Sequence, residues 1–273
     1  MFEIMEQEMK LKNFSRKTIS TYLYYNHDFI KFCQKSPRDV TAKDIRLYLL
    51  NFLEKGKTSS TINLAHNALN FYYGRILKRK VKDVPFQKRE QKTKILASQF
   101  EINRMHSVVR NPKHKLMISV LYASGVRISE LVKIKISDLD LENRLLLVRQ
   151  GKGMKDRSTI LSYTVVEEIK RYLDQRPYKS EYLFASREGH VCPRTVEAII
   201  KTALQKAKIS KNITPHSLRH SFATHHMEQG TRTEYIQKML GHKDIRTTRS
   251  YEQVTNRHLL DVKSPHDKMD SKT

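Results

Sequence analysis

The first third of the chain carries apolar residues at helical spacing, and this periodicity constrains its fold more than any other feature. The apolar positions recur every three or four residues, as in helices that bury one face. Three such stripes occupy residues 19–33, 45–53 and 62–76. Thr41 precedes the second stripe as a helix N-cap, and Gly56 follows it as a stop signal. Because no alternating strand pattern is found in this region, we predict a helical N-terminal domain.

The periodicity is interrupted by the segment VPFQKREQKTK, residues 84–94. One proline, several basic residues and little apolar pattern are typical of a linker. At 273 residues the chain is long enough for two hydrophobic cores. We therefore predict a helical domain at residues 1–84, a basic linker at 85–94 and a second domain at 95–273.

The second domain combines helices with one predicted β-hairpin. RLLLV (144–148) and STIL (158–161) have strand composition and flank a Gly-Lys-Gly tip at 151–153. YLFAS (182–186) is a candidate third strand of that sheet. Amphipathic patterns, caps and stop signals predict helices at 194–208, 215–229 and 231–240. The predicted fold class is mainly α with a small antiparallel β-sheet.

The composition predicts a polyanionic partner. The chain has 52 Lys and Arg residues against 28 Asp and Glu residues, a formal net charge of +24 and a pI of about 10.0. Such an excess of positive charge is typical of proteins that bind nucleic acid. The N-terminal residues predicted to be exposed and to contact DNA are Arg16, Lys17, Lys57, Arg75, Lys78, Arg79 and Lys80.

Neither a membrane span nor a secretory signal is expected. The sequence has no apolar run long enough to cross a bilayer, and its start, MFEIMEQEMK, carries acids where a signal peptide carries bases. Cys33 and Cys192 are far apart, which predicts ordinary thiols in a reducing compartment. We therefore expect a cytoplasmic protein with no membrane partner.

Several residues lie in motifs suited to phosphodiester chemistry. The densest is TPHSLRHSFATH at residues 214–225, in which Thr214 caps a predicted helix. His216 and Arg219 then lie one turn apart on one helix face, where both can reach one phosphate. MLGH ends at His242, and TTRSYEQV brings Tyr251 nine positions later.

Two further basic residues lie at positions that favour substrate contact. Arg127 follows a helix that is predicted to end at Gly125, just before the next helix begins. Lys152 lies at the predicted hairpin tip, from which it could deliver a proton. A single basic residue among 52 is most often a solvated charge, so only the joint order of these residues carries weight.

In order and spacing these residues resemble the catalytic residues of the tyrosine recombinases, the integrase family that includes the Xer-type resolvases. The resemblance covers nearly the whole chain. The positions that carry it are Arg127, Lys152, His216, Arg219, His242 and Tyr251. It implies a site-specific DNA recombinase that cuts and rejoins duplex DNA through a covalent 3′-phosphotyrosine intermediate, in Xer-like resolution or in integration and excision.

The resemblance also implies a role for each residue. Arg127 and Arg219 would hold the non-bridging phosphate oxygens, because a guanidinium stays charged and can bind two oxygens at once. Lys152 would protonate the departing 5′ oxygen, which is a poor leaving group without a general acid. Tyr251 would attack phosphorus, and the two histidines would handle protons or donate hydrogen bonds. Such a site needs no metal and no cofactor, and we assign none.

The family architecture implies how the two domains act. A helical core-binding domain and a larger catalytic domain close around double-stranded DNA as a clamp. Four protomers, a homo-tetramer, usually act on two DNA sites.

Alternatives remain open. VKSP near the end resembles integron-type and mobile-element integrases, whereas the compact length resembles Xer proteins. A type IB topoisomerase would use the same tyrosine chemistry but would relax supercoils without joining two sites. A DNA-binding regulator without activity is the third class, although all six expected residues are present.

Some neighbouring residues receive no catalytic role. His216 and His220 have the spacing of a zinc pair, but the glutamate base of zinc proteases is missing, so we expect His220 to support the site or the core. We expect His225 and His226 on the helix surface. The acidic run at residues 137–142 is interpreted as the solvent face that leads into a strand.

Overall fold

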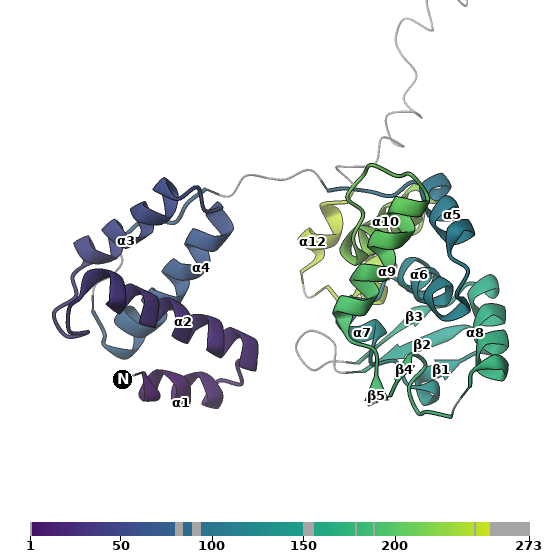
Figure 1. Cartoon of the computed structure of the whole chain (residues 1–273), viewed down its shortest axis with the longest axis horizontal. Helices are drawn as coiled ribbons and strands as arrows, with labels where there is room; N and C mark the ends of the chain where they lie inside the picture. Colours follow the sequence, from purple (N-terminus) through teal and green to yellow (C-terminus); the bar gives the residue numbers. More distant parts are fainter. Residues whose placement is uncertain are drawn as a thin grey trace, which may run out of the picture. The chain divides into compact units, whose positions relative to one another are not determined.

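The structure is a computed structural model that describes residues 2–79, 84–88, 94–149, 156–177, 179–187, 189–242 and 244–251. The chain divides into two compact units, Met1–Lys92 and Thr93–Thr273. Each unit has its own hydrophobic core. Helices α1 to α4 and the π-helix η1 belong to the first unit, and the strands and helices from α5 onward belong to the second (Figure 1).

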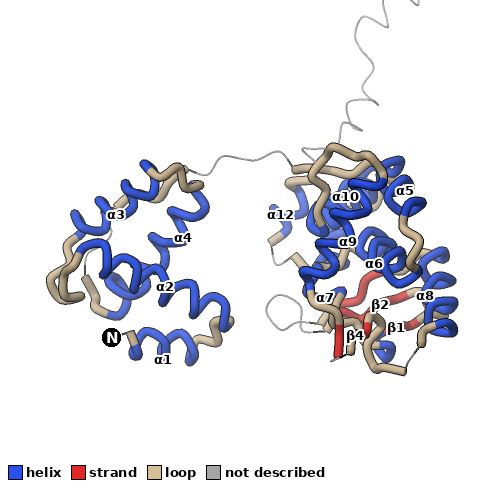
Figure 2. The backbone as a smooth tube through the Cα atoms, in the orientation of Figure 1, coloured by secondary structure: helices blue, strands red, loops and turns tan. Residues whose placement is uncertain are grey.

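Every regular element that the structure describes in the N-terminal unit is a helix (Figure 2). These elements are α1 (Glu3–Leu11), α2 (Arg16–Cys33), α3 (Ala42–Glu54), α4 (Ser59–Leu69) and the π-helix η1 (Asn70–Ile76). Thr41 is the N-cap of α3, as predicted. The Asp44 N–H donates to Thr41 Oγ1 at 3.3 Å, and the Thr41 N–H donates to the Asp44 carboxylate at 2.8 Å. This capping box satisfies two backbone donors that the helix itself leaves free.

Aromatic side chains dominate the N-terminal core. The Phe29 ring packs against the rings of Tyr48 and Tyr73, with centroids 5.2 and 5.6 Å apart. Such edge contacts add stability beyond the burial of apolar area. The buried Tyr48 hydroxyl donates a hydrogen bond to the Asp28 carboxylate at 2.6 Å. Asn63 exchanges two hydrogen bonds of 2.9 Å with the backbone of Gln87, so the start of the predicted linker contacts this unit.

The third predicted helix changes form along its length. α4 ends at Leu69, and the chain continues as the π-helix Asn70–Ile76. The wider π turn lets the consecutive residues Tyr72 and Tyr73 both point into the core. The apolar stripe predicted this burial, but its spacing does not distinguish an α-turn from a π-turn.

Arg79 differs from its prediction as an exposed residue. It is half-buried, and its guanidinium donates to the carbonyl oxygens of Arg38 and, at 2.7 Å, Val40. Its guanidinium therefore joins the segment after η1 to the α2–α3 connection. The predicted basic residues that are exposed are Arg16, Lys17, Lys57, Arg75 and Lys78. Lys80 lies outside the described residues.

The second unit, Thr93–Thr273, is built around α6, which is buried on most of its surface. Its helices are α5 (Gln99–Val108), α6 (Pro112–Ser124), α7 (Ile128–Leu131), the 3-10 helix η2 (Ile136–Asp138), α8 (Tyr163–Gln175), α9 (Pro193–Lys206), α10 (Pro215–Glu228), α11 (Thr233–Leu240) and α12 (Ile245–Arg249). α6 packs against α5, α8, α9 and α10. In the described ranges, no helix combines the length and the apolar character needed to cross a bilayer.

The predicted hairpin is present. β1 (Leu139–Asp140), β2 (Leu145–Val148) and β3 (Arg157–Ile160) form an antiparallel sheet in the order β1-β2-β3. Leu145 pairs with Ile160 and Val148 with Arg157. The hairpin tip, residues 150–155, lies outside the described residues, and Lys152 lies there with it. The mainly helical fold with a small antiparallel sheet is confirmed.

The prediction that residues 182–186 add the third strand to this sheet is wrong. β4 (Ala185–Ser186) pairs with β5 (Gly189–His190) in a separate two-stranded sheet, and β1 takes the third position in the larger sheet. Leu183 and Phe184 are fully buried in the core. The apolar composition of the segment therefore reflects burial. Its backbone groups are paired partly in the local hairpin and partly with the segment before η2, where the Leu183 N–H donates to the Ile134 carbonyl at 2.8 Å.

The interpretation of the acidic run at residues 137–142 as a solvent face is correct for Asp140 and Glu142, which are exposed, and wrong for Asp138. Asp138 is only 5% exposed. Its carboxylate accepts hydrogen bonds from Arg149 Nε at 2.5 Å and from the Lys135 N–H at 3.0 Å. Its charge is therefore used inside the fold, as the cap of η2 and the partner of Arg149.

Candidate active site

Arg127 is the N-cap residue of α7, directly after the turn that ends α6. Its N–H donates to Glu130 Oε2 at 2.7 Å, and its guanidinium Nη1 donates to Glu130 Oε1, also at 2.7 Å. Glutamate at this position of a helix commonly returns a hydrogen bond to the N-cap. The Arg127 side chain is 25% exposed, so its guanidinium can still contact a ligand.

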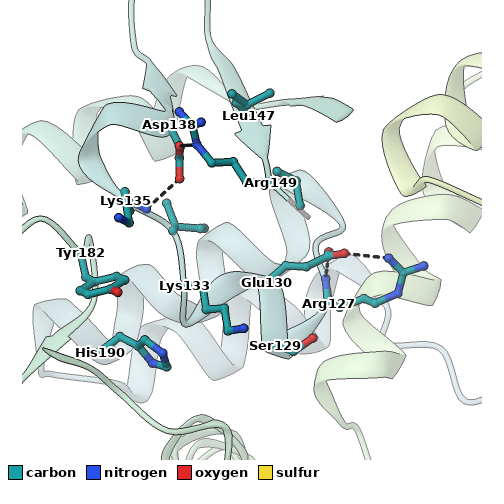
Figure 3. A pocket seen from close by; sticks show the side chains of 12 residues that line it. Arg127, Ser129, Glu130, Lys133, Lys135, Asp138, Leu147, Arg149, Tyr182 and His190 are labelled. Carbon is teal, nitrogen blue, oxygen red and sulfur yellow. Dashed lines mark hydrogen bonds and ion pairs between the residues drawn. The ribbon is translucent and has the colours of Figure 1, made fainter. Parts of the chain in front are cut away.

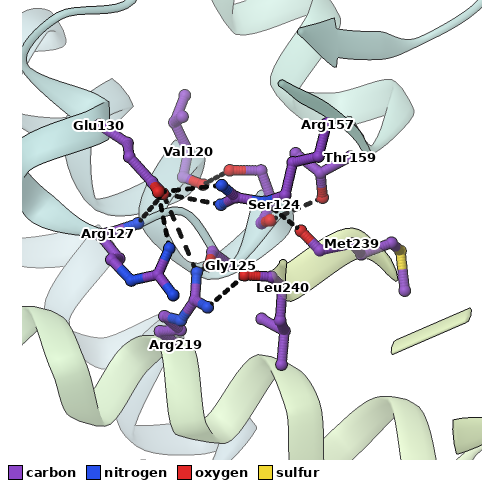
Figure 4. A network of polar contacts seen from close by, with 10 residues as sticks. All are labelled: Val120, Ser124, Gly125, Arg127, Glu130, Arg157, Thr159, Arg219, Met239 and Leu240. Atoms are coloured by element: carbon purple, nitrogen blue, oxygen red, sulfur yellow. Dashed lines mark hydrogen bonds and ion pairs between the residues drawn. The ribbon is translucent and has the colours of Figure 1, made fainter. Parts of the chain in front are cut away.

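The Glu130 carboxylate lies among the guanidinium groups of three arginines (Figure 4). Besides Arg127, it accepts two hydrogen bonds from Arg157, at 2.9 and 2.7 Å, and Arg219 Nη1 lies 4.0 Å from Oε2. Burial opposes ionisation of Glu130, but the hydrogen bonds from Arg157 and Arg127 hold its pKa at about 2. One carboxylate thus faces three guanidinium groups, and this cluster keeps an excess of positive charge.

Arg219 is held at the ends of two helices. Its side chain is almost fully buried, and it donates to the carbonyl oxygens of Gly125 and Leu240, at 2.5 Å each. These carbonyls lie at the C-termini of α6 and α11, where unpaired carbonyl groups attract a cation. Gly125 and Gly241 adopt left-handed φ values of 61° and 64°, as expected for the predicted helix stops. Burial lowers the pKa of Arg219 to about 9, which leaves it charged at neutral pH.

His216 and His242 lie close to the arginine cluster from two different elements. His216 is one turn before Arg219 on α10, and His242 follows the last turn of α11. His242 Nδ1 lies 2.9 Å from Thr248 Oγ1. Burial, together with the positive charges of Arg219 and Arg127, lowers the pKa of both histidines, that of His242 to about 3. Both rings are neutral at pH 7 and can exchange hydrogen bonds with a ligand.

Tyr251 is buried beside these residues, directly after α12. Its hydroxyl Oη lies 2.7 Å from His220 Nδ1, and its ring stacks at 15° to the His242 ring with centroids 6.2 Å apart. Burial raises the pKa of Tyr251, while the charges of Arg219 and Arg127 lower it in part. The arginine cluster is therefore close enough to act on the ionisation of the phenol.

Lys94 lies over the ring of the tyrosine. Its Nζ lies 3.8 Å from the centre of the Tyr251 ring and donates to Ser250 O at 3.1 Å and to Ser250 Oγ at 2.6 Å. A cation over an aromatic face is attracted by the ring and favours a negative charge on it. The sequence placed Lys94 in the linker, and nothing in its context indicated a contact with residue 251.

The structure brings together five of the six predicted residues: Arg127, His216, Arg219, His242 and Tyr251. Lys152 is outside the described residues. Sequence reasoning missed Glu130, Arg157 and Lys94. Glu130 could have been found from its position three residues after an N-cap, but Arg157 and Lys94 carry no local signal.

The prediction that His225 and His226 lie on the helix surface is wrong. Both are half-buried. His225 Nδ1 lies 2.8 Å from the Tyr122 hydroxyl, and His226 Nδ1 lies 3.2 Å from Thr231 Oγ1. His220 lies in the site itself, because its ring contacts both His216 and Tyr251.

An open pocket of about 640 Å³ adjoins Arg127 (Figure 3). Lys133, Lys135 and Arg149 line it, and Arg149 is paired with Asp138. The pocket thus extends the positive charge of the arginine cluster along the surface, which suits a polyanion such as a nucleic-acid backbone. Among the described residues, no group of three or more His, Cys, Asp or Glu side chains is arranged to hold a metal ion.

Two protein-family models match the sequence. The model described as "Phage integrase family" matches residues 94–258, and "Phage integrase, N-terminal SAM-like domain" matches residues 1–83. The chain belongs to the phage integrase family of tyrosine recombinases. It is therefore an enzyme of DNA cleavage and rejoining.

Curated tyrosine recombinases are similar in sequence to this chain over most of its length. The chain is 35% identical to the tyrosine recombinase XerA of Pyrococcus horikoshii over 262 residues, which cover 93% of this chain and 89% of the relative. It is 30% identical to the tyrosine recombinase XerD of Oceanobacillus iheyensis over 265 residues, which cover 90% of this chain and 88% of the relative.

Solved structures share the fold. A crystal structure of XerA recombinase is 32% identical, with a TM-score of 0.57 and 94% of both chains covered. A lambda integrase dimer bound to a COC′ core site has a TM-score of 0.74 at 19% identity and covers 92% of this chain and 93% of that chain. The second likeness concerns the fold alone.

Proposed function

We propose that the recombinase cuts DNA with Tyr251 as its nucleophile and forms a 3′-phosphotyrosine there. The observation that carries this proposal is the position of Tyr251 beside the arginine cluster, where Arg127 and Arg219 act on its pKa. Burial raises the pKa of Tyr251, and the two guanidinium charges offset part of that rise, so the cluster favours loss of a proton that a phenol otherwise keeps up to pH ~10.

Arg127 and Arg219 form the proposed clamp on the non-bridging oxygens. Glu130 neutralises part of their charge and fixes Arg127 by two hydrogen bonds of 2.7 Å. Preorganised cations of this kind stabilise the charge that develops on the attacked phosphorus without moving during the reaction. Arg219 is fixed by two carbonyl groups, so it supplies charge from a constant position.

The remaining roles concern protons. Lys152 is the proposed general acid for the departing 5′ oxygen. His216 and His242 are neutral and are proposed to donate hydrogen bonds to the same phosphate. No metal or other cofactor takes part in the proposed chemistry.

Double-stranded DNA is the proposed partner of both units. The exposed basic residues of the N-terminal unit, among them Arg16, Lys57 and Arg75, are proposed to contact the backbone. A homo-tetramer on two DNA sites is the proposed active assembly, as in the family that the chain belongs to. Light scattering on complexes with two duplexes would give the mass of four protomers if this is right.

Trapping the covalent intermediate tests the nucleophile. On a nicked suicide substrate, the wild-type chain should form a covalent DNA adduct, and peptide mass spectrometry should place it on Tyr251. Tyr251→Phe should bind DNA and form no adduct. Tyr235→Phe, at an exposed tyrosine on α11, is the matched control and should react normally. An adduct in Tyr251→Phe, or on another residue, would contradict the proposal.

A sulfur-substituted substrate tests the acid. Lys152→Ala should slow cleavage by roughly 10²–10⁴ with little change in DNA affinity. Sulfur at the bridging 5′ position leaves without a proton, so this substrate should restore most of the rate. Rescue of a His216 or His242 variant in place of Lys152→Ala would reassign the acid.

A further inference from the structure

The proton of Tyr251 needs an acceptor, and the six proposed catalytic residues do not supply an obvious one. His220 Nδ1 lies 2.7 Å from Tyr251 Oη, within strong hydrogen-bond range. We propose that His220 is a further catalytic residue, which accepts the proton of Tyr251 as the tyrosine attacks phosphorus. This inference rests on the proposed role of Tyr251 as the nucleophile.

The position of the imidazole is set by the fold. His220 follows Arg219 on α10, and its ring contacts the His216 ring with centroids 4.3 Å apart. The same helix therefore carries one arginine of the proposed clamp and the acceptor next to it. An acceptor within hydrogen-bond reach of the proton that it removes is the first geometric requirement of general base catalysis.

Other groups near the tyrosine are less suited to this role. Lys94 Nζ is a donor to Ser250 and lies over the ring. His242 Nδ1 is engaged with Thr248 Oγ1. Of the described groups, His220 Nδ1 is the one within hydrogen-bond distance of the hydroxyl.

The surroundings keep His220 neutral before DNA binds. Burial lowers its pKa to about 4, with further contributions from His216, Lys94 and Arg219. The titratable or charged groups around it are His216 and Arg219 on α10, Lys94 before α5, His242 after α11 and Tyr251 after α12. A neutral imidazole has one nitrogen free to accept a proton. A bound phosphodiester adds a negative charge among these cations, which favours protonation of the ring.

The proton balance closes within one catalytic cycle. In cleavage, the bond between Tyr251 Oη and phosphorus forms as the bond from phosphorus to the 5′ oxygen breaks. The phenol proton passes to His220 Nδ1, and the 5′ oxygen takes a proton from the proposed acid, Lys152. In rejoining, the 5′ hydroxyl attacks and returns its proton to Lys152, while His220 returns its proton to the departing tyrosine.

The tautomer of His220 tests the proposal without any loss of folding. In the full-length protein with ¹⁵N-labelled histidine, His220 should carry its proton on Nε2 and leave Nδ1 free at neutral pH. Tyr251→Phe removes the hydroxyl and should shift the Nδ1 resonance. A proton on Nδ1 would make His220 a donor to the tyrosine and would overturn the proposal.

Kinetics provide the second test. In His220→Asn, the amide oxygen can occupy the place of Nδ1 and accept a hydrogen bond, but it cannot take the proton. Cleavage of the suicide substrate should slow by about 10²–10⁴. With 3-fluorotyrosine at position 251, whose phenol ionises at lower pH, the variant should recover most of this loss. In the protein that keeps His220, the same fluorotyrosine should change the cleavage rate little.

His225→Asn is the matched control, because His225 lies on the same helix and its Nδ1 also contacts a tyrosine hydroxyl, that of Tyr122, at 2.8 Å. It should cleave at close to the wild-type rate. Equal slowing of His220→Asn with and without fluorine, or a rate equal to that of His225→Asn, would overturn the proposal. An adduct that maps to a residue other than Tyr251 would instead overturn the proposed nucleophile, so the two failures are distinguishable.

Discussion

The two units of the recombinase bury different kinds of side chain. The N-terminal unit packs aromatic rings around Phe29, and the Tyr48 hydroxyl is tied to the Asp28 carboxylate at the edge of that core. The second unit, Thr93–Thr273, which we call the catalytic unit, buries Arg219 and Glu130 beside its hydrophobic core. Buried ion pairs seldom stabilise a fold more than apolar groups of the same size would. The contrast indicates that the N-terminal core is organised for stability, whereas the buried charge cluster fits the phosphate site that we propose.

Glu130→Gln should produce the largest effect on stability. The substitution leaves Arg157 and Arg219 buried without their carboxylate, and breaking such a cluster typically costs about 3–5 kcal/mol. Chemical denaturation of the full chain measures it. Glu181→Gln is the control, because its ion pair with Lys135 is largely exposed and should change the free energy of unfolding by less than about 1 kcal/mol. Equal effects of the two substitutions would mean that the buried charge cluster contributes no more to stability than an exposed ion pair of the same unit.

Tyr48→Phe tests the N-terminal side of the comparison and should cost less. It removes a hydrogen bond to a carboxylate but keeps the aromatic packing, so we expect a loss of about 1.5–3 kcal/mol in the N-terminal unit. Tyr24→Phe, at an exposed tyrosine, should change stability little. A loss as large as that of Glu130→Gln would mean that both cores depend on charge to the same extent.

Acidification should destabilise the catalytic unit more than the N-terminal unit. Burial lowers the pKa of His220 to about 4 and that of His242 to about 3, so the unfolded chain binds protons below pH ~6.5 that the folded chain does not. Stability is therefore present above pH ~6.5 and is lost as the pH falls toward the folded pKa values, by roughly 1 kcal/mol per histidine at pH 5.5.

Calorimetry of the full chain above pH ~6.5 and at pH 5.5 measures this loss of stability. Glu130→Gln and Tyr48→Phe assign the transitions to the two units. In the N-terminal unit burial lowers the pKa of His66 as well, so a smaller shift of the same sign is expected there. Equal shifts of both transitions would argue against the comparison.

Removal of metal ions should have the smallest effect. If the arginine cluster supplies the positive charge for catalysis, cleavage and strand transfer should proceed unchanged in EDTA. Loss of cleavage in EDTA that Mg²⁺ or Zn²⁺ restores would move the chemistry to a metal-dependent class.

The regular parts of the fold could be predicted from the sequence because their signals are local. Thr41 and Gly125 mark helix ends by their own chemistry, and the strands β2 and β3 follow from composition on either side of a glycine-rich tip. The partner of residues 185–186 could not be predicted, because a short apolar segment carries the same pattern whether it joins a sheet or fills a core. The π-helix η1 was missed for a similar reason.

The candidate site divides in the same way. His216 and Arg219 share a helix turn, so their spacing in the sequence is their spacing in space. Glu130, Arg157 and Lys94 reach the site through contacts between distant segments, which no local pattern records. The depth of burial of Tyr251 and Arg219 also depends on tertiary packing.

The central claim is that Arg127 and Arg219 meet the negative charge of one phosphate. Cleavage of a substrate with a methylphosphonate at the scissile position tests it most directly, because the methyl group removes that negative charge. Arg127→Ala should slow cleavage of the natural phosphodiester by roughly 10²–10³ and should lose most of this deficit on the methylphosphonate. Arg149→Ala, in the adjoining pocket, should show the same small effect on both substrates. An equal deficit of Arg127→Ala on both substrates would contradict the account.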